Sequence, residues 1–193
     1  MEGELEDLRW ELDGRWKDLG ITLEWIDERA SWTHRDTGAP GNIDGFFQSA
    51  ARLMRLCAYD YLLLGPMFFH AVVGLEAMLR LHYQATKKQV FRSLFQQAVD
   101  DGIFHDGLFS DRRPVWNGFD KRIGPGRKGH IKKLAVLVPG LRNDYFHGGY
   151  LLHPDLLFMT IQIREMADAL TMPRTPEWKL AMQAARVAKD GTS

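Results

Sequence analysis

Residues 69–83 have the sequence Phe69-His-Ala-Val-Val-Gly-Leu-Glu-Ala-Met-Leu-Arg-Leu-His-Tyr83, in which apolar side chains recur every three or four positions. This period is typical of an α-helix that buries one face in a hydrophobic core. The core-facing side is predicted to consist of Phe69, Val72, Val73, Glu76, Leu79, Arg80 and Tyr83. The stretch therefore predicts an amphipathic helix, the third along the chain.

Glu76 is the one carboxylate on this apolar face. Burying an unpaired carboxylate is costly, so Glu76 is expected to have a cationic partner. Arg142 is our candidate for that partner, and the contact would set the direction of its guanidinium. The alternative is an exposed pair with Arg80, one helical turn further along. The sequence leaves both pairings open.

Helical periods also occur on both sides of this stretch. They predict helices over residues 5–19, 44–62, 91–98, 131–138 and 155–170, a short helical piece at 141–147 and a tail helix at 176–188. Because proline lacks a backbone N–H, Gly65-Pro66 is expected to end or kink the 44–62 helix, and Pro139-Gly140 to interrupt the chain after 138. Residues 21–42 are expected to be irregular, and 105–130 to form a long functional or mobile loop.

The predicted fold class is all-α, because no segment shows the alternation typical of strands. We expect an up-down helical bundle of four to five core helices with an N-terminal extension. The predicted boundaries are 1–42 for the extension, 43–171 for the bundle and 172–193 for the tail helix. In the last core helix the residues predicted to lie inside are Leu156, Thr160, Ile163, Ala167 and Leu170, and those predicted to lie outside are Asp155, Gln162, Glu165 and Asp168.

The composition indicates a soluble protein of the cytoplasm. Cys57 is the only cysteine, so no disulfide can form within the chain. The first residues are acidic and lack the apolar region of a signal peptide. The longest apolar stretch, about residues 58–79, contains Asp60, His70 and Glu76, which a membrane-spanning helix rarely carries. No membrane is expected as a partner.

A second run carries the candidate chemistry: Leu141-Arg142-Asn143-Asp144-Tyr145-Phe146-His147-Gly148-Gly149. It places an arginine and a histidine five positions apart. A guanidinium is always cationic and can bind a phosphate with two parallel hydrogen bonds, while imidazole exchanges protons near neutrality. Another Arg-x4-His pair, Arg29 and His34, has Ala after the Arg and precedes a Gly/Pro-rich stretch, so we treat it as coincidence. The candidate catalytic residues are therefore Arg142, Asn143 and His147.

The Arg142-Asn143 and His147-Gly148 pairs resemble the motif of the HEPN family, compact helical domains that include many metal-independent ribonucleases. The resemblance covers about residues 44–171. It implies that Arg142 binds the scissile phosphate, that His147 is a general acid or base, and that Asn143 orients His147 or the ribose. It also implies a homodimer whose two motifs face each other. Some HEPN toxins continue as His-x-Tyr, where this chain has Gly149.

What the resemblance implies is a metal-independent endoribonuclease with a toxin, antiphage or RNA-processing role, cleaving RNA by attack of the ribose 2′-OH. No cofactor and no metal is expected, and on a regular helix Arg142 and His147 would lie about 140° apart, unlike an i, i+4 metal pair. An antitoxin or a nucleotidyltransferase is a further expected partner.

Two other functions remain open: a non-catalytic HEPN module that binds RNA, a nucleotide or a protein, and a structural adaptor. In the structural alternative Arg142 forms a salt bridge with a neighbouring helix, Asn143 caps, and His147 closes a helix.

Charge is unevenly distributed, although the formal net charge of the chain is zero. Residues 1–30 contain ten acidic and four basic side chains, whereas residues 112–142 contain nine basic side chains and one acidic one. A local positive field attracts a polyanion by releasing its counterions. The predicted RNA contacts in this stretch are Arg127, Lys128, Lys132 and Lys133. The alternative is a solvated loop whose charges face the acidic N-terminal residues.

Overall fold

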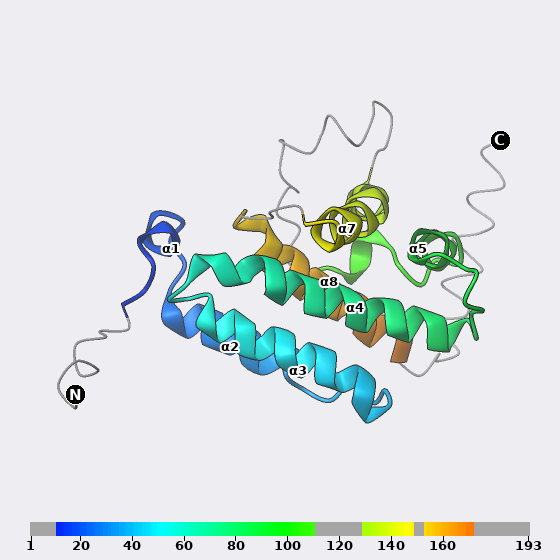
Figure 1. The fold of residues 1–193 in the computed structure, drawn as a ribbon, viewed down its shortest axis with the longest axis horizontal. Coiled ribbons are helices and arrows are strands. Elements are labelled where there is room, and N and C mark those ends of the chain that lie inside the picture. Colours follow the sequence, from blue (N-terminus) through cyan, green and yellow to red (C-terminus); the bar gives the residue numbers. More distant parts are fainter. Residues whose placement is uncertain (1–10, 111–128, 149–152, 172–193) are drawn as a thin grey trace.

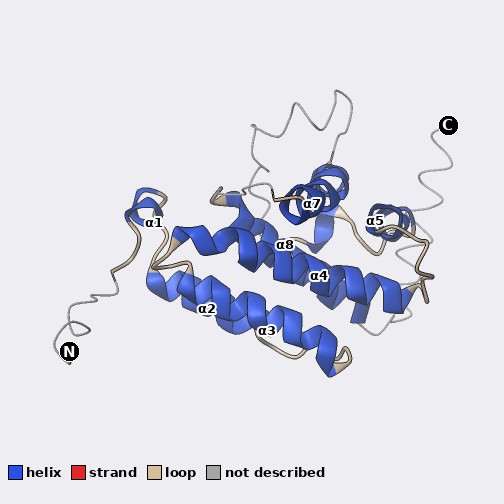
Figure 2. Ribbon diagram, in the orientation of Figure 1, coloured by secondary structure: helices blue, strands red, loops and turns tan. Residues whose placement is uncertain are grey.

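The computed structural model describes residues 11–110, 129–148 and 153–171. These residues form helices and no strand (Figure 2), so the all-α prediction is confirmed. The α-helices are α1 (Gly14–Asp18), α2 (Leu23–Thr33), α3 (Gly41–Leu56), α4 (Leu64–His82), α5 (Phe91–Asp100), α7 (His130–Phe146) and α8 (Asp155–Thr171). Two short 3₁₀ helices are η1 (Tyr61–Leu63) and η2 (Asp106–Leu108). The predicted tail helix at 176–188 lies outside the described residues.

Four helices, α2, α3, α4 and α8, lie along a common direction, and α5 and α7 cross them (Figure 1). α2 and α3 are antiparallel, because Arg55 at the end of α3 donates from Nε to Oδ1 of Asp27 near the start of α2, at 2.6 Å. α4 in turn runs antiparallel to α3 (Figure 1). α8 then runs parallel to α2, with the rings of Trp25 and Phe158 near their starts 5.6 Å apart.

α4 is the central helix, and it packs against α3, α5, α7 and α8. Its inner side chains are fully buried, among them Phe68, Val72, Leu75 and Leu79. The segment Tyr61–His82 is long and apolar enough to cross a membrane by length and composition, but 56% of that window is buried inside the protein. Its place in the core accounts for its apolar composition.

The segment predicted to be irregular, 21–42, contains the regular helix α2, so that prediction is wrong for residues 23–33. Thr22 begins this helix by accepting a hydrogen bond from the N–H of Trp25 at 3.2 Å. Ile26 and Ala30 bury the inner face in the core shared with α3 and α4. In α1, Trp16 is fully buried and donates from Nε1 to the carbonyl of Cys57 at 2.7 Å.

The predicted effects of the two prolines are also wrong. α7 continues through Pro139. An interior proline costs a helix about 3 kcal/mol, but each fully buried Leu or Val contributes about 1.5 to 3 kcal/mol, and four such side chains surround Pro139: Leu134, Leu137, Val138 and Leu141. α3 ends at Leu56, before Gly65-Pro66, and Pro66 lies in the first turn of α4, where a backbone N–H has no helical acceptor.

Two other helices match their predicted patterns closely. The predicted stripe Phe91, Leu94, Phe95 and Ala98 is buried in α5, and Gly102 follows it with a φ of 69°. In α8 the predicted inner residues from Leu156 to Ala167 are buried. Gln162, predicted to lie outside, is only 2% exposed, because α8 is covered by α2, α3, α4 and η2.

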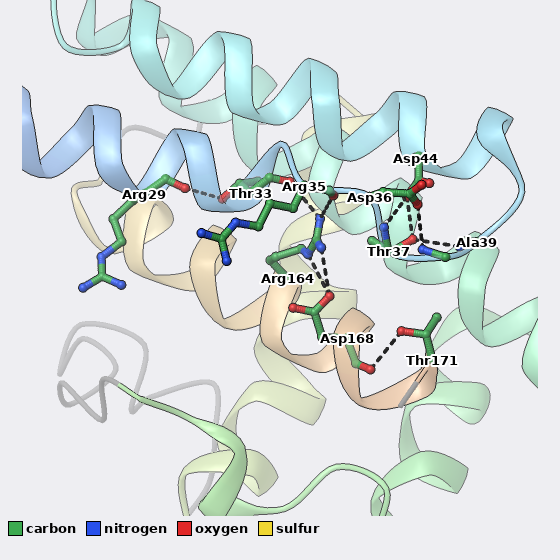
Figure 3. Close-up of polar contacts among 11 residues, drawn as sticks. Arg29, Thr33, Arg35, Asp36, Thr37, Ala39, Asp44, Arg164, Asp168 and Thr171 are labelled. Atoms are coloured by element: carbon green, nitrogen blue, oxygen red, sulfur yellow. Dashed lines mark hydrogen bonds and ion pairs between the residues drawn. The ribbon is translucent and has the colours of Figure 1, made fainter. Parts of the chain in front are cut away.

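Arg164 of α8 lies at the centre of the polar contacts in Figure 3. Its Nη1 donates to the carbonyls of Thr33 and Arg35, at 2.8 and 2.7 Å. Its Nε and Nη2 contact Oδ1 of Asp168, at 3.0 and 2.9 Å. The side chain of Arg164 is 3% exposed. This one guanidinium therefore fixes the end of α2 against α8.

Candidate functional site

Arg142 lies on the last turns of α7 and contacts α4 through Glu76. Its Nη2 donates to Oε2 of Glu76 at 3.1 Å. The other oxygen of Glu76, Oε1, accepts from Nη2 and Nε of Arg80, at 2.9 and 3.2 Å. The two pairings that the sequence left open therefore occur together, and Glu76 bridges an arginine of its own helix and one of α7.

This ion cluster is partly buried. The side chain of Glu76 is 13% exposed, that of Arg142 29% and that of Arg80 33%. Nε of Arg142 is buried and has no hydrogen-bond acceptor among the residues that the structure describes. A buried, unsatisfied donor is rare in folded proteins. The Glu76 contact thus holds Arg142 in one direction without using all of its N–H groups.

The residues around Arg142 give the site an aromatic side. Oδ1 of Asn143 accepts from Nη1 of Arg142 at 3.3 Å. The guanidinium of Arg142 lies 5.5 Å from the ring centre of Phe146, and Phe146 is 66% exposed. An exposed ring beside a cation is an arrangement that nucleic-acid bases can stack on.

His147 follows directly and is exposed at the end of α7. It is the C-cap residue, and its backbone N–H donates to the carbonyl of Asn143 at 3.0 Å. Its ring lies 5.9 Å from that of Phe146 in an edge-to-face arrangement. Among the residues that the structure describes, no hydrogen bond joins Arg142 to His147. Within one chain the two candidate catalytic side chains are neighbours across Phe146, not direct partners.

The contacts of the structural alternative are present in part. Arg142 does form a salt bridge to a neighbouring helix, and His147 does close α7 before Gly148, whose φ is 83°. Asn143 lies in the last turns of α7 and accepts from Arg142, so it does not serve as the cap of the helix. These contacts position the motif and are compatible with either function.

The predicted RNA contacts separate into two groups. Arg127 and Lys128 lie outside the described residues. Lys132 and Lys133 are in the first turn of α7, where Oδ1 of Asp106 accepts the N–H of Ile131 at 2.7 Å. Lys132 and Arg142 are ten positions apart on the helix, which is about 15 Å along the axis. The structure therefore does not bring these lysines to the motif.

Arg142 and Asn143 line a pocket of about 380 Å³ between α4, α5 and α7. α5 contributes Arg92 to it, which the sequence pattern did not single out. Arg92 follows the buried Phe91 on the exposed side of α5 and resembles any surface arginine in its local sequence. Only the packing of α5 beside α7 reveals it.

Metal ligands do not gather in the part of the chain that the structure describes: no group of three or more His, Cys, Asp or Glu side chains there is placed to hold an ion. Comparison with protein-family models, with curated proteins and with solved structures finds no match for this chain.

Proposed function

We propose that this protein is a metal-independent endoribonuclease of the HEPN type, which cleaves RNA by attack of the ribose 2′-OH on the adjacent phosphodiester. One observation carries the proposal. Glu76 holds Arg142 near the end of α7 at which His147 is exposed, and the guanidinium of Arg142 keeps N–H groups that do not bind Glu76. An always-cationic phosphate ligand and a titratable imidazole are the two groups that this reaction needs.

In the proposed reaction Arg142 binds the phosphate and stabilises the charge that develops on it. The 2′-oxygen forms a bond to phosphorus, and the bond from phosphorus to the 5′-oxygen breaks. His147 accepts the proton of the 2′-OH or donates one to the leaving 5′-oxygen. Asn143 orients the ribose or His147. The products are a 2′,3′-cyclic phosphate, or its hydrolysed form, and a 5′-hydroxyl end.

We place the complete site in a homodimer. One Arg and one His make a small active site, and a two-fold axis would double it by bringing Arg142 of one protomer toward His147 of the other. Phe146, 66% exposed beside both, is apolar surface available for such a contact. The setting we propose is cytoplasmic, in a toxin, antiphage or RNA-processing system, with an antitoxin or a nucleotidyltransferase as a further partner.

The chain offers a matched control for the decisive experiment. His34, like His147, is an exposed C-cap residue five positions after an arginine. Purified wild type, His147→Ala and His34→Ala would be incubated with RNA in EDTA. We expect cleavage by wild type and His34→Ala, and a loss of about 10²- to 10⁴-fold in His147→Ala. Equal loss in both variants would contradict the assignment, and so would activity that disappears with EDTA and returns with Mg²⁺ or Mn²⁺.

The main rival is a non-catalytic HEPN module that binds RNA, a nucleotide or a protein. The Arg142–Glu76 salt bridge favours it as much as it favours catalysis, because both functions need a positioned cation. Wild type that binds RNA tightly and cuts none under any condition would establish this rival. Light scattering at tens of micromolar tests the homodimer, since a mass that stays monomeric would exclude the shared site.

A further inference from the structure

The pocket beside Arg142 has an unusual set of charges. Three arginines line it, Arg80 and Arg142 facing the shared carboxylate of Glu76, and Arg92 on α5. Three guanidinium groups against one carboxylate leave an excess of two positive charges in one concavity. Since this excess is carried by side chains that are about one-third exposed or more, an anion can approach it from solvent.

Protein acceptors do not occupy all the N–H groups of these three arginines. Arg92 has no hydrogen bond or ion pair within the described residues. Arg80 donates from Nε and Nη2 to Glu76 and from Nη1 to the carbonyl of Thr86 at 3.3 Å. Arg142 donates from Nη2 to Glu76 and from Nη1 to Asn143. A guanidinium has five N–H groups, so each of the three arginines retains N–H groups that can donate to a phosphoryl oxygen.

Apart from Asn143, the remaining walls of the pocket are apolar. They are formed by Val90, Phe91, Pro139 and Gly140, and Val90 is 63% exposed. A side-chain carbon built on Gly140 would meet no atom within 4 Å, so the helix backbone there borders open space. With a volume of about 380 Å³, the pocket is within the usual size range of small-ligand sites.

We propose that this pocket binds a nucleoside phosphate, with the phosphoryl group between Arg92 and Arg142 and the sugar and base along Val90 and Gly140. Its ligand is either a free nucleotide or one nucleotide of a bound RNA. The second source rests on the proposed ribonuclease function, in which Arg142 already faces the substrate. His147 does not line the pocket, so binding there does not depend on the catalytic histidine.

Gly140 provides a sharp test. Gly140→Leu adds a side chain to the open space of the pocket and raises the helix propensity of α7, so it should block the ligand without unfolding the protein. Gly45→Leu is the matched control, because Gly45 is also inside a helix, in α3, and also has no atom within 4 Å of an added side-chain carbon. Circular dichroism would confirm that both variants fold.

Binding to the full-length protein would be measured by calorimetry with adenosine 5′-monophosphate, inorganic phosphate and adenosine. We expect the monophosphate to bind, adenosine to bind at least about tenfold more weakly, Arg92→Ala to weaken the monophosphate about 10- to 100-fold, and Gly140→Leu to abolish binding. Gly45→Leu should bind as wild type does. No binding of the monophosphate by wild type, or equal binding by Gly140→Leu, would overturn the proposal.

A 2′-O-methyl RNA oligonucleotide, which lacks the attacking hydroxyl, identifies the source of the ligand. Competition between this RNA and adenosine 5′-monophosphate assigns the pocket to an RNA nucleotide, and simultaneous binding assigns it to a free nucleotide. The two proposals fail separately. RNA cleavage that requires His147, without monophosphate binding, refutes the pocket alone, and monophosphate binding without any cleavage refutes the ribonuclease alone.

Discussion

Arg164 and Arg142 each contact a carboxylate and an aromatic ring, but their surroundings differ. Arg164 is 3% exposed and donates to two backbone carbonyls as well as to Asp168. Arg142 is 29% exposed, donates once to Glu76, and lines an open pocket. A guanidinium surrounded by protein acceptors has a structural role, whereas one with free donors in a concavity is available to a ligand. The same residue type thus serves stability in α8 and, in our proposal, chemistry in α7.

The largest effect on stability is expected from Arg164→Met, which keeps the aliphatic stem but removes the guanidinium. The carbonyls of Thr33 and Arg35 would then be left without this donor, and each unsatisfied buried group costs about 1 to 3 kcal/mol. We expect the free energy of unfolding to fall by about 2 to 4 kcal/mol, measured by urea denaturation. Arg35→Ala is the control, since Arg35 contributes its backbone to this cluster, and should change stability by less than about 0.5 kcal/mol. Similar free energies of unfolding for the two variants would show that the guanidinium of Arg164 does not link α2 to α8.

A smaller effect is expected from Glu76→Gln, which leaves Arg80 and Arg142 without their shared negative charge. The cluster is partly exposed, so we expect a loss of about 1 to 2 kcal/mol. A double-mutant cycle with Arg142→Ala measures the coupling between the two side chains, which should be about 0.5 kcal/mol or more. A coupling of zero would mean that Glu76 does not position Arg142. Arg142→Ala alone should cost less than about 1 kcal/mol in stability and abolish cleavage.

Phe146→Ala should leave stability within about 0.5 kcal/mol, because the ring is 66% exposed. If RNA bases stack on it, the same change should weaken RNA binding by about 1 to 3 kcal/mol, measured with the 2′-O-methyl oligonucleotide. Leu62→Ala is the control, since Leu62 is also exposed, at 51%, and lies at η1, in a different part of the chain. Equal RNA affinity in wild type and Phe146→Ala would remove Phe146 from the site.

The smallest effect concerns two histidines near the connection from α7 to α8. Burial lowers the pKa of His153 below its ordinary value of 6.5, although Asp155 acts in the opposite direction, and Nδ1 of His153 accepts the N–H of Asp155 at 3.2 Å. The unfolded chain therefore takes up a proton at a pH at which the folded chain does not. Stability should fall as the pH decreases below about 6.5 and level off below the pKa of the folded state.

Urea unfolding at pH 7.5 and 5.5 checks this, with His153→Gln losing the dependence attributable to His153 and His147→Gln keeping it. For RNA cleavage the roles of the two histidines are exchanged. The pH dependence of cleavage should be lost in His147→Gln and kept in His153→Gln. A stability difference between the two pH values that is the same in His153→Gln as in wild type would contradict the assignment.

Local sequence patterns are sufficient to predict a helix whose apolar residues form one face that packs against the core. The sequence predicts the buried stripe of α5 correctly, and that of α8 from Leu156 to Ala167, because a 3.6-residue period directly marks the buried side. The sequence pattern misses α2 because the apolar residues of this helix do not fall on one clear stripe, as those of α5 do, and α2 is stabilised by packing on α3 and α8. The break at Pro139 was predicted for a local reason, and it does not occur because burial on both sides outweighs one lost hydrogen bond.

The amino-acid sequence alone established that the protein is all-α, and it singled out Arg142, Asn143, His147 and Glu76 as the residues with the most interesting chemistry. These conclusions depend on periodicity and on residue type, which are local properties. The tertiary structure alone revealed that Glu76 holds both Arg80 and Arg142, that Arg92 joins them at a pocket, and that Arg164 is buried against the end of α2. Each of these contacts joins separate parts of the chain, and such proximity follows from the packing of whole helices, which no local pattern encodes.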